Sequence, residues 1–262
     1  MLEANNLTFK VGSREIVSDV SASFPPGQLT LMIGPNGAGK STLIKLLSGL
    51  VRAHAGSVKY DGTDIRETNE RELAKCRAVL SQTVEVAFPL TVKEVVMMGR
   101  YPHFGNKPGE VDTEIVVELL HSFDLTELSD RNYQALSGGE RQRVNFARVL
   151  AQISNSGNAD DTRRKYLFLD EPLTFLDIAH QIEFMKRVHD FARSPNVVTV
   201  GVIHDLNITS RYADQIVVLH EGKVEAVGTA PEVLQPDLIR RVFNVNPTFV
   251  PIDPSGMYMI FD

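Results

Sequence analysis

Residues 28–47 read QLTLMIGPNGAGKSTLIKLL, and within this stretch a strand pattern gives way to a helix pattern across a glycine-rich loop. Residues 28–33 form a short, β-prone apolar run, whereas residues 40–47 carry apolar side chains at helical spacing. The loop between them, residues 34–41, satisfies the pattern G-x-x-x-x-G-K-[ST], which is informative only between a strand and a helix. Average composition would produce this match by chance about 1 time in 100. The stretch therefore predicts an α/β fold.

The loop at residues 34–41, which we call the phosphate loop, has the composition of an anion-binding site. Its glycines let the backbone approach phosphates, and successive N–H groups together with the helix N-terminus attract negative charge. Lys40 is expected to reach the β- and γ-phosphates of a nucleotide, and the Ser41 hydroxyl to bind Mg²⁺. The expected binding residues are Gly34, Pro35, Asn36, Gly37, Ala38, Gly39, Lys40 and Ser41.

A second apolar run, residues 165–169, ends in the carboxylates Asp170 and Glu171. Open α/β sheets place their ligands at the carboxyl ends of the strands, so this position suits a metal and a water molecule. We expect Asp170 to hold Mg²⁺ through the ligand shell of the ion, and Glu171 to polarise the water that attacks the γ-phosphate. Alone, a strand ending in Asp-Glu is more often a helix N-cap, but the phosphate loop favours the metal site.

Two further runs end in polar side chains that could complete this site. Residues 197–203 form an unbroken apolar strand followed by His204, which could sense the γ-phosphate. Gln82 follows the short strand at residues 78–81 and offers a neutral oxygen to the metal or the water. An isolated histidine would more often be structural, but the position of His204 at the end of a parallel strand argues for a functional role. Alone, Gln82 would be an ordinary surface glutamine.

These motifs, together with LSGGE at residues 136–140, resemble the ATP-binding subunit of an ABC transporter over nearly the whole chain. The resemblance implies an α/β P-loop NTPase of the ABC ATPase cassette type, with a RecA-like core, an antiparallel β subdomain and an inserted helical subdomain. ATP and Mg²⁺ are the implied cofactors. The ATP-binding segment then extends to Thr42, Gln82 begins the loop that couples to a membrane partner, and His204 is the switch histidine.

The resemblance also implies that one chain holds half of each ATP site. Ser137, Gly138, Gly139 and Asp177 are expected to contact the ATP bound by a second subunit, which makes a head-to-tail homodimer the active species. The local pattern agrees, because residues 136–140 lead into a helix with Glu140 in its first turn, and such an N-terminus attracts anions.

Two positions depart from the family pattern. The family usually has an aromatic residue that stacks on adenine where this chain has Val11, and Phe9, expected on the same strand face, could substitute in part. Residues 172–177 read PLTFLD, where the family more often has Thr-Ser-Ala-Leu-Asp after the proline. The aspartate of that segment, Asp177, is retained.

Length and composition fit one domain spanning residues 1–262. We expect residues 1–84 and 154–262 to form the catalytic core with the β subdomain, and residues 85–153 to form the helical subdomain that contains the signature. A net charge of -6 and a pI near 5.7 argue against nucleic-acid binding. The single cysteine, Cys76, excludes a disulfide within the chain. Since neither a signal peptide nor a spanning segment is recognisable, a membrane role requires a partner.

The identity of the cargo rests on two segments. Residues 98–103, MGRYPH, resemble the ATP-binding subunits of importers for iron-siderophores, haem and vitamin B12, and we expect them to dock a partner. The polar insert at residues 154–164 resembles haemin importer ATPases, so haem is the expected cargo. The implied partners are two copies of an integral membrane permease and a periplasmic haem-binding protein, with the chain peripheral at the cytoplasmic face of the bacterial inner membrane.

Other classes of function stay open at this point. A ferric-siderophore or vitamin B12 importer would share the same motifs. A soluble ABC ATPase of DNA repair or translation would also show them, but such proteins usually carry two cassettes or a long coiled-coil insertion. Tyr101 and His103 could in principle ligate haem iron, although the ATPase of such a system lies away from the transport path.

Overall fold

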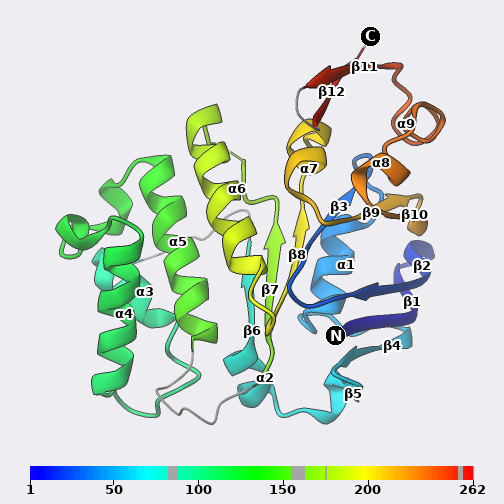
Figure 1. The fold of residues 1–262 in the computed structure, drawn as a ribbon. Coiled ribbons are helices and arrows are strands. Elements are labelled where there is room, and N and C mark those ends of the chain that lie inside the picture. Colours follow the sequence, from blue (N-terminus) through cyan, green and yellow to red (C-terminus); the bar gives the residue numbers. More distant parts are fainter. Residues whose placement is uncertain (82–87, 155–162, 175, 253–255, 262) are drawn as a thin grey trace.

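The chain folds around a six-stranded sheet whose spatial order differs from the order along the sequence (Figure 1). This computed structural model describes residues 1–81, 88–154, 163–174, 176–252 and 256–261. The strands lie in the order β10 (Lys223–Gly228), β9 (Gln215–His220), β3 (Leu29–Ile33), β8 (Val197–Val202), β7 (Lys165–Asp170) and β6 (Arg77–Leu80). All neighbouring pairs are parallel except β10 and β9, which form a hairpin. The predicted α/β class is confirmed, and β3, β8 and β7 deliver their carboxyl ends side by side.

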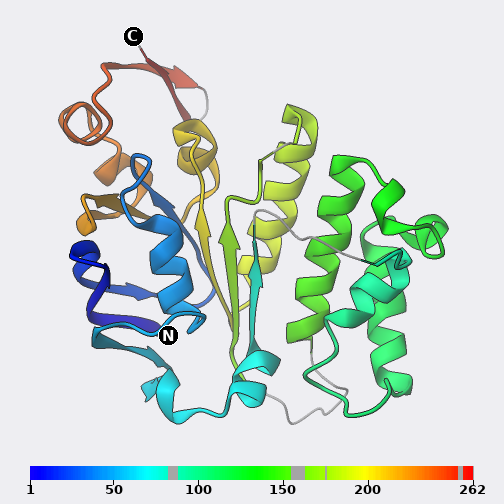
Figure 2. The same ribbon diagram turned by 180° about the vertical axis from the view of Figure 1, so that it is seen from behind.

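Both faces of the sheet are covered, which explains why its central strands are apolar throughout. Successive side chains of β3 alternate between two cores, with Leu29 and Leu31 in one and Met32 in the other. Helix α6 (Ile178–Ala192) covers the first face, and α1 (Lys40–Leu47) covers the second (Figures 1 and 2). The strand, loop and helix expected at residues 28–47 are therefore present, with the phosphate loop at the edge between the two layers.

A four-stranded antiparallel sheet packs over α1 on the second face. Its order is β2 (Arg14–Phe24), β1 (Leu2–Val11), β4 (Ala55–Tyr60) and β5 (Thr63–Asp64). Its inward side chains, including Leu7, Val17 and Phe24, join α1 in one apolar core. The short helix α2 (Glu70–Cys76) then leads into β6, after a 3₁₀ turn at Ile65–Glu67.

Between β6 and β7, in the range expected to form a helical subdomain, the chain forms a group of helices beside the sheet. These helices are α3 (Val92–Met98), α4 (Glu110–Ser122) and α5 (Gly138–Ile153), with 3₁₀ turns at Thr126–Leu128 and Tyr133–Ala135. Helix α5 lies closest to the sheet, and α3 and α4 lie outside it (Figure 1). The C-terminal part adds α7 (Leu206–Tyr212), α8 (Ala230–Val233), α9 (Pro236–Phe243) and a hairpin of β11 (Pro247–Ile252) and β12 (Gly256–Phe261).

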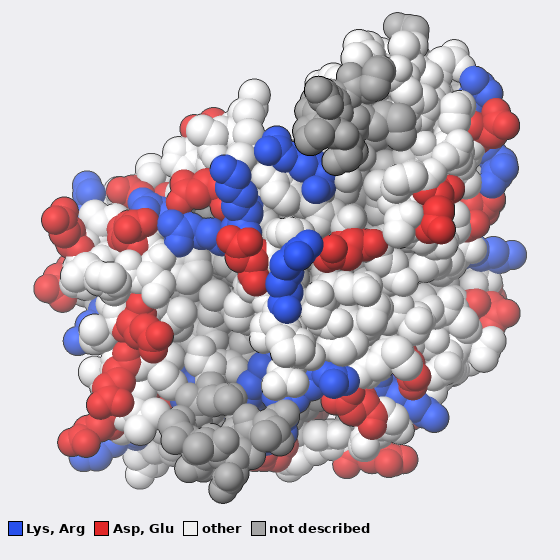
Figure 3. Space-filling model, in the orientation of Figure 1, with Lys and Arg blue, Asp and Glu red and all other residues white. Residues whose placement is uncertain are grey.

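The surface shows no single-sign field on the face drawn in Figure 3, where acidic and basic side chains are intermingled. Two arginines that could suggest a basic patch are used within the fold: Arg141 donates to the Leu136 carbonyl at 3.0 Å, and Arg143 donates to the Phe123 carbonyl at 3.2 Å. Within the described ranges, none of the helices combines the length and apolar character needed to cross a bilayer.

Candidate functional site

The phosphate loop passes so close to neighbouring strands that two of its positions accept only glycine. A Cβ on Gly34 would lie 2.1 Å from the Leu219 carbonyl oxygen, and one on Gly39 would lie 2.5 Å from the Ile16 carbonyl oxygen. Both glycines also have positive φ angles, +152° and +96°, which side chains disfavour. The loop is thus held between β9 and β2 by contacts of its own backbone.

Lys40, the first residue of α1, is buried and folded over this loop. Its Nζ donates to the carbonyl oxygens of Gly34 at 2.8 Å and of Pro35 at 2.9 Å. Burial lowers the pKa of Lys40, and the nearby carboxylates of Glu171 and Asp170 act in the opposite direction. The helix start has Gly39 as its N-cap, so no side chain caps the N–H groups of its first turn. A cation and free N–H groups therefore share the position expected to hold phosphates.

Asp170 lies at the carboxyl end of β7, as the strand pattern predicts, and there it forms a hydrogen bond with Ser41. Asp170 Oδ1 is buried and has no hydrogen-bond partner among the described residues. Burial is the main reason that the pKa of Asp170 is raised, and a hydrogen bond with Ser41 acts in the opposite direction. A hydroxyl and a carboxylate with an unpaired oxygen fit Mg²⁺, which prefers oxygen ligands and usually takes one or two from the protein and the rest from phosphates and water.

A larger metal cage is not present in the part of the chain that the structure describes, where no group of three or more His, Cys, Asp or Glu side chains could hold a metal ion. Gln82, the further oxygen ligand expected from the sequence, lies outside the described residues. So does most of the polar insert, residues 155–162.

Glu171 and His204 come from adjacent strand ends and form a direct pair. His204 Nε2 lies 2.8 Å from Glu171 Oε1. Glu171 has φ of +52°, a left-handed conformation that is uncommon for residues other than glycine, asparagine and aspartate. Such strain is found at functional sites where the surrounding structure holds the backbone. The ends of β7 and β8 thus bring these two side chains together.

The signature segment, residues 136–140, forms the N-terminus of α5 as expected. Ser137 Oγ accepts from the Glu140 N–H at 3.3 Å, and Glu140 Oε2 accepts from the Ser137 N–H at 2.7 Å, which is a capping box. Both ribbon views place α5 and α1 on opposite sides of β6, β7 and α6 (Figures 1 and 2). The fold therefore does not bring the signature segment to the phosphate loop of the same chain.

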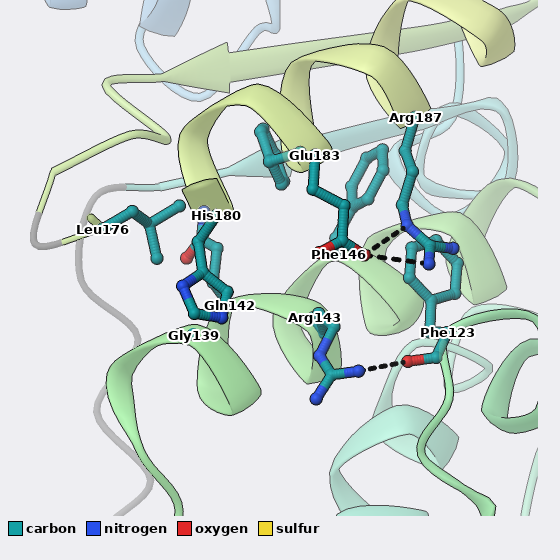
Figure 4. A pocket seen from close by; sticks show the side chains of 10 residues that line it. Phe123, Gly139, Gln142, Arg143, Phe146, Leu176, His180, Glu183 and Arg187 are labelled. Atoms are coloured by element: carbon teal, nitrogen blue, oxygen red, sulfur yellow. Dashed lines mark hydrogen bonds and ion pairs between the residues drawn. The ribbon is translucent and has the colours of Figure 1, made fainter. Parts of the chain in front are cut away.

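Asp177 caps α6, a structural role that the sequence reasoning missed. Its Oδ1 accepts from the His180 backbone N–H at 2.9 Å and lies 2.8 Å from His180 Nδ1. An aspartate directly before a helical repeat is the signal that could have shown this cap. His180 was not singled out by any motif, yet it lines a pocket between α5 and α6 together with Gly139 and Gln142 (Figure 4).

The departure at Val11 leaves the expected adenine position without an exposed aromatic side chain. Val11 is 62% exposed, whereas the Phe9 ring lies 5.1 Å from the His54 ring and packs against the core. A register shift between Phe9 and Lys10 interrupts the alternation on which a shared strand face depends. Phe9 is thus occupied by contacts within the fold.

Residues 98–103, expected to dock a partner, are only partly exposed, because Gly99 and Arg100 are buried. A Cβ on Gly99 would lie 2.1 Å from the Arg148 carbonyl oxygen, so this glycine permits the close packing of α3 on α5. Arg100 is fully buried, and His103 Nε2 lies 2.7 Å from the Gln152 carbonyl oxygen. Tyr101, at 58% exposure, remains as a side chain that a partner could contact.

Comparisons with known proteins agree with one another. Residues 17–174 match the protein family described as ABC transporter. A hemin import ATP-binding protein, HmuV, from Agrobacterium fabrum is 41% identical over 94% of this chain and 92% of its own length. The protein of the same name from Rhodopseudomonas palustris strain BisA53 is 42% identical over 93% of this chain and 88% of its own length.

Solved structures resemble the whole fold. A putative metal-chelate type ABC transporter in an inward-facing conformation has a TM-score of 0.83 and 25% identity, covering 100% of this chain and 96% of that one. The dimeric structure of MJ0796, a bacterial ABC transporter cassette, has a TM-score of 0.72 and 25% identity, covering 88% and 99%.

Proposed function

The chain belongs to the ABC transporter family as an ATP-binding cassette, and on this basis we propose that it is the ATP-hydrolysing subunit of a haem importer. The observation that carries the hydrolytic part of the proposal is the Glu171–His204 pair, which lies next to Asp170 at the ends of β7 and β8. A carboxylate in this position is a candidate general base, and it is distinct from the carboxylate that bonds Ser41.

The nucleotide would be held by the phosphate loop. Its N–H groups and the start of α1 bind the phosphates, and Lys40 turns from the Gly34 and Pro35 carbonyls to the β- and γ-phosphates. Thr42 completes the ATP-binding segment in this proposal. Mg²⁺, held by Ser41 and Asp170 with Gln82 as the further ligand, would neutralise charge on the β- and γ-phosphate oxygens.

Glu171 would accept the proton of the attacking water. The Glu171 backbone is held in a left-handed conformation, and His204 Nε2 lies 2.8 Å from the Glu171 carboxylate. When ATP is bound, His204 can also orient toward the γ-phosphate, which would couple the state of the nucleotide to the position of the base.

The active species would be a head-to-tail homodimer with two ATP molecules at the interface. Support comes from the separation of α5 from the phosphate loop within one chain, and from the dimeric solved structure of a related cassette. In this arrangement Ser137, Gly138, Gly139 and Asp177 complete the site of the partner subunit. In this proposal residues 1–84 and 154–262 form the catalytic core with the β subdomain, and residues 85–153 form the helical subdomain.

The cargo proposal rests on the relatives named hemin import ATP-binding proteins, which cover nearly all of the chain. We propose a permease partner in two copies, a periplasmic haem-binding protein acting through it, and a peripheral location at the cytoplasmic face of the inner membrane. The resemblance to a putative metal-chelate type transporter keeps a ferric-siderophore importer as the second candidate.

The test of hydrolysis uses Glu171→Gln. This variant should bind ATP with Mg²⁺ and form a stable dimer in size-exclusion chromatography with light scattering. It should hydrolyse ATP at least about 100-fold more slowly than wild type, because a general base contributes about 10²–10⁴-fold. Lys40→Ala should lose ATP binding. Glu114→Gln, an exposed substitution on α4, is the matched control and should behave as wild type. Wild-type turnover in Glu171→Gln would contradict the assignment of the base.

The test of cargo uses the same trapped variant. Glu171→Gln purified with ATP from detergent-solubilised membranes of its native host should bring down a multi-helix permease, identified by mass spectrometry. Haem in the assembly should give its absorbance band, whereas a ferric siderophore would give iron without that band. Recovery with ribosomes or DNA alone would contradict the transporter proposal.

A further inference from the structure

His180 makes an unusual contact with the signature segment of its own chain. A Cβ built on Gly139 would lie 3.0 Å from His180 Cδ2 and 3.1 Å from His180 Nε2. The imidazole therefore occupies the space that a side chain at residue 139 would need. Figure 4 shows the ring descending from the first turn of α6 onto the first turn of α5, beside Gly139.

The ring is held in this position by Asp177. Asp177 Oδ1 accepts a hydrogen bond from the His180 backbone N–H at 2.9 Å, and it lies 2.8 Å from His180 Nδ1. The same oxygen therefore caps α6 and holds the imidazole. These bonds also lower the pKa of the Asp177 carboxyl. With Nδ1 directed at Asp177, the opposite edge of the ring faces Gly139.

A second contact ties the same two segments together one turn further along α5. Gln142 Nε2 donates to the Pro172 carbonyl oxygen at 2.6 Å, directly after the carboxylate strand. Pro172 and His180 therefore both contact α5, through Gln142 and Gly139 respectively. The side chain of His180 is 48% exposed, so burial of apolar surface does not account for its position.

We propose that His180 is a positioning residue that holds the signature segment and Asp177 in one fixed relation, in which both meet the ATP bound by the partner subunit. This inference rests on the head-to-tail dimer of the proposed function. His180 does not touch the nucleotide. It acts through Gly139, whose backbone lies against the ring, and through Asp177, which caps α6 with the same oxygen that holds the ring.

The first test separates positioning from binding. His180→Ala should lower kcat about 10-fold, because misplacement of a catalytic contact by about 1 Å can cost up to about 100-fold. KM for ATP and the Kd of the isolated subunit should change less than 2-fold, since the phosphate loop is untouched. His180→Gln, which keeps a donor for Asp177, should recover most of kcat. His121→Ala on exposed α4 is the matched control.

Thermal unfolding of each variant is measured alongside. A loss of kcat in His180→Ala that His180→Gln does not restore, or a kcat within 2-fold of wild type, would overturn the proposal. If His180→Ala does not fold, the comparison is made between His180→Gln and His180→Asn, because the shorter amide reaches Asp177 less well and should lose more kcat.

The second test asks on which subunit His180 acts. Heterodimers are isolated with two affinity tags and followed in a single turnover. In one heterodimer, His180→Ala is on one chain and Glu171→Gln is on the other. The ATP site with the intact Glu171 is then completed by the signature segment of a chain that keeps His180. In the other, both substitutions are on one chain, so the intact base faces the altered signature segment.

The first heterodimer should hydrolyse ATP about 10-fold faster than the second, in line with the loss of kcat in the homodimer. Equal rates, or the reverse order, would overturn the inference, because a role within the same chain predicts the reverse. Failure of the proposed function is a distinct result: Glu171→Gln chains would then form no dimer with ATP and Mg²⁺, and no heterodimer could be isolated.

Discussion

Arg100→Met is expected to destabilise the helical segment between β6 and β7 more than any surface substitution. The guanidinium is fully buried, and its Nε donates to Asp112 Oδ1 at 2.9 Å. One terminal nitrogen donates to the carbonyl oxygens of Ala151 at 2.7 Å and Ser154 at 2.8 Å, at the C-terminal end of α5. Arg100 thereby connects the end of α3 with α4 and α5.

The magnitude follows from what the substitution leaves behind. Asp112 is 7% exposed. In the variant it would keep the hydrogen bond from the Gly109 N–H, at 2.9 Å, but would lose the guanidinium of Arg100. Removing one member of a buried ion pair costs about 3–5 kcal/mol. Since a domain is stabilised by only about 5–15 kcal/mol, this is a large fraction of the total.

The assay is urea unfolding followed by far-UV circular dichroism, with hydrogen exchange to locate the loss in α3, α4 and α5. The double variant Arg100→Met with Asp112→Leu should recover more than half of the lost free energy, because apolar replacement of a whole buried pair is often neutral. The control is Lys10→Met, whose pair with Glu15 lies at the surface and is worth about 0–1 kcal/mol. A loss below about 1 kcal/mol for Arg100→Met, or a double variant no more stable than the single one, would refute the reasoning.

Three further predictions concern the nucleotide site. Gly34→Ala should abolish ATP binding in a fluorescent-nucleotide assay, because its Cβ would lie 2.1 Å from the Leu219 carbonyl oxygen, whereas Gly105→Ala, which meets nothing within 4 Å, should bind normally. Val11→Tyr should tighten ATP binding at least about 5-fold, because stacking of a base on an aromatic ring is worth about 1–3 kcal/mol; unchanged titrations would contradict an open adenine position. Asp170→Asn should raise the melting temperature of the nucleotide-free protein at pH 8, because the raised pKa of Asp170 means that ionisation opposes folding there. That gain should shrink as the pH falls through the raised folded pKa toward the ordinary value of aspartate, and a gain that grows on acidification would contradict the shift.

The sequence was sufficient for the parts of the site that depend on local patterns and on parallel strands. The phosphate loop could be located because a strand and a helix flank its glycines, and parallel strands bring their carboxyl ends to one edge. The contact between Glu171 and His204 follows from that rule although the two residues are far apart in the chain. The capping box of Ser137 and Glu140 follows from four residues of sequence.

The remaining features depend on packing between elements that the patterns place only coarsely. Arg100 was expected near a docking surface, yet it is buried because Gly99 lets α3 approach α5 closely. The contact of His180 with Gly139 depends on the relative position of α5 and α6, which no short motif encodes. Phe9 was expected on the same strand face as Val11, but a register shift lies between Phe9 and Lys10. A single-residue shift in a strand reverses the direction of every following side chain.

The left-handed backbone of Glu171 has a consequence for how the chain could be redesigned. Its φ of +52° would suit glycine or asparagine better than glutamate, and a non-glycine residue held there costs about 1–3 kcal/mol. A programme that selects substitutions only for folding stability would therefore favour replacing Glu171 at an early step. The product would be a more stable cassette that still binds nucleotide and has lost its base, so thermal shift data alone would rank an inactive protein above the natural one.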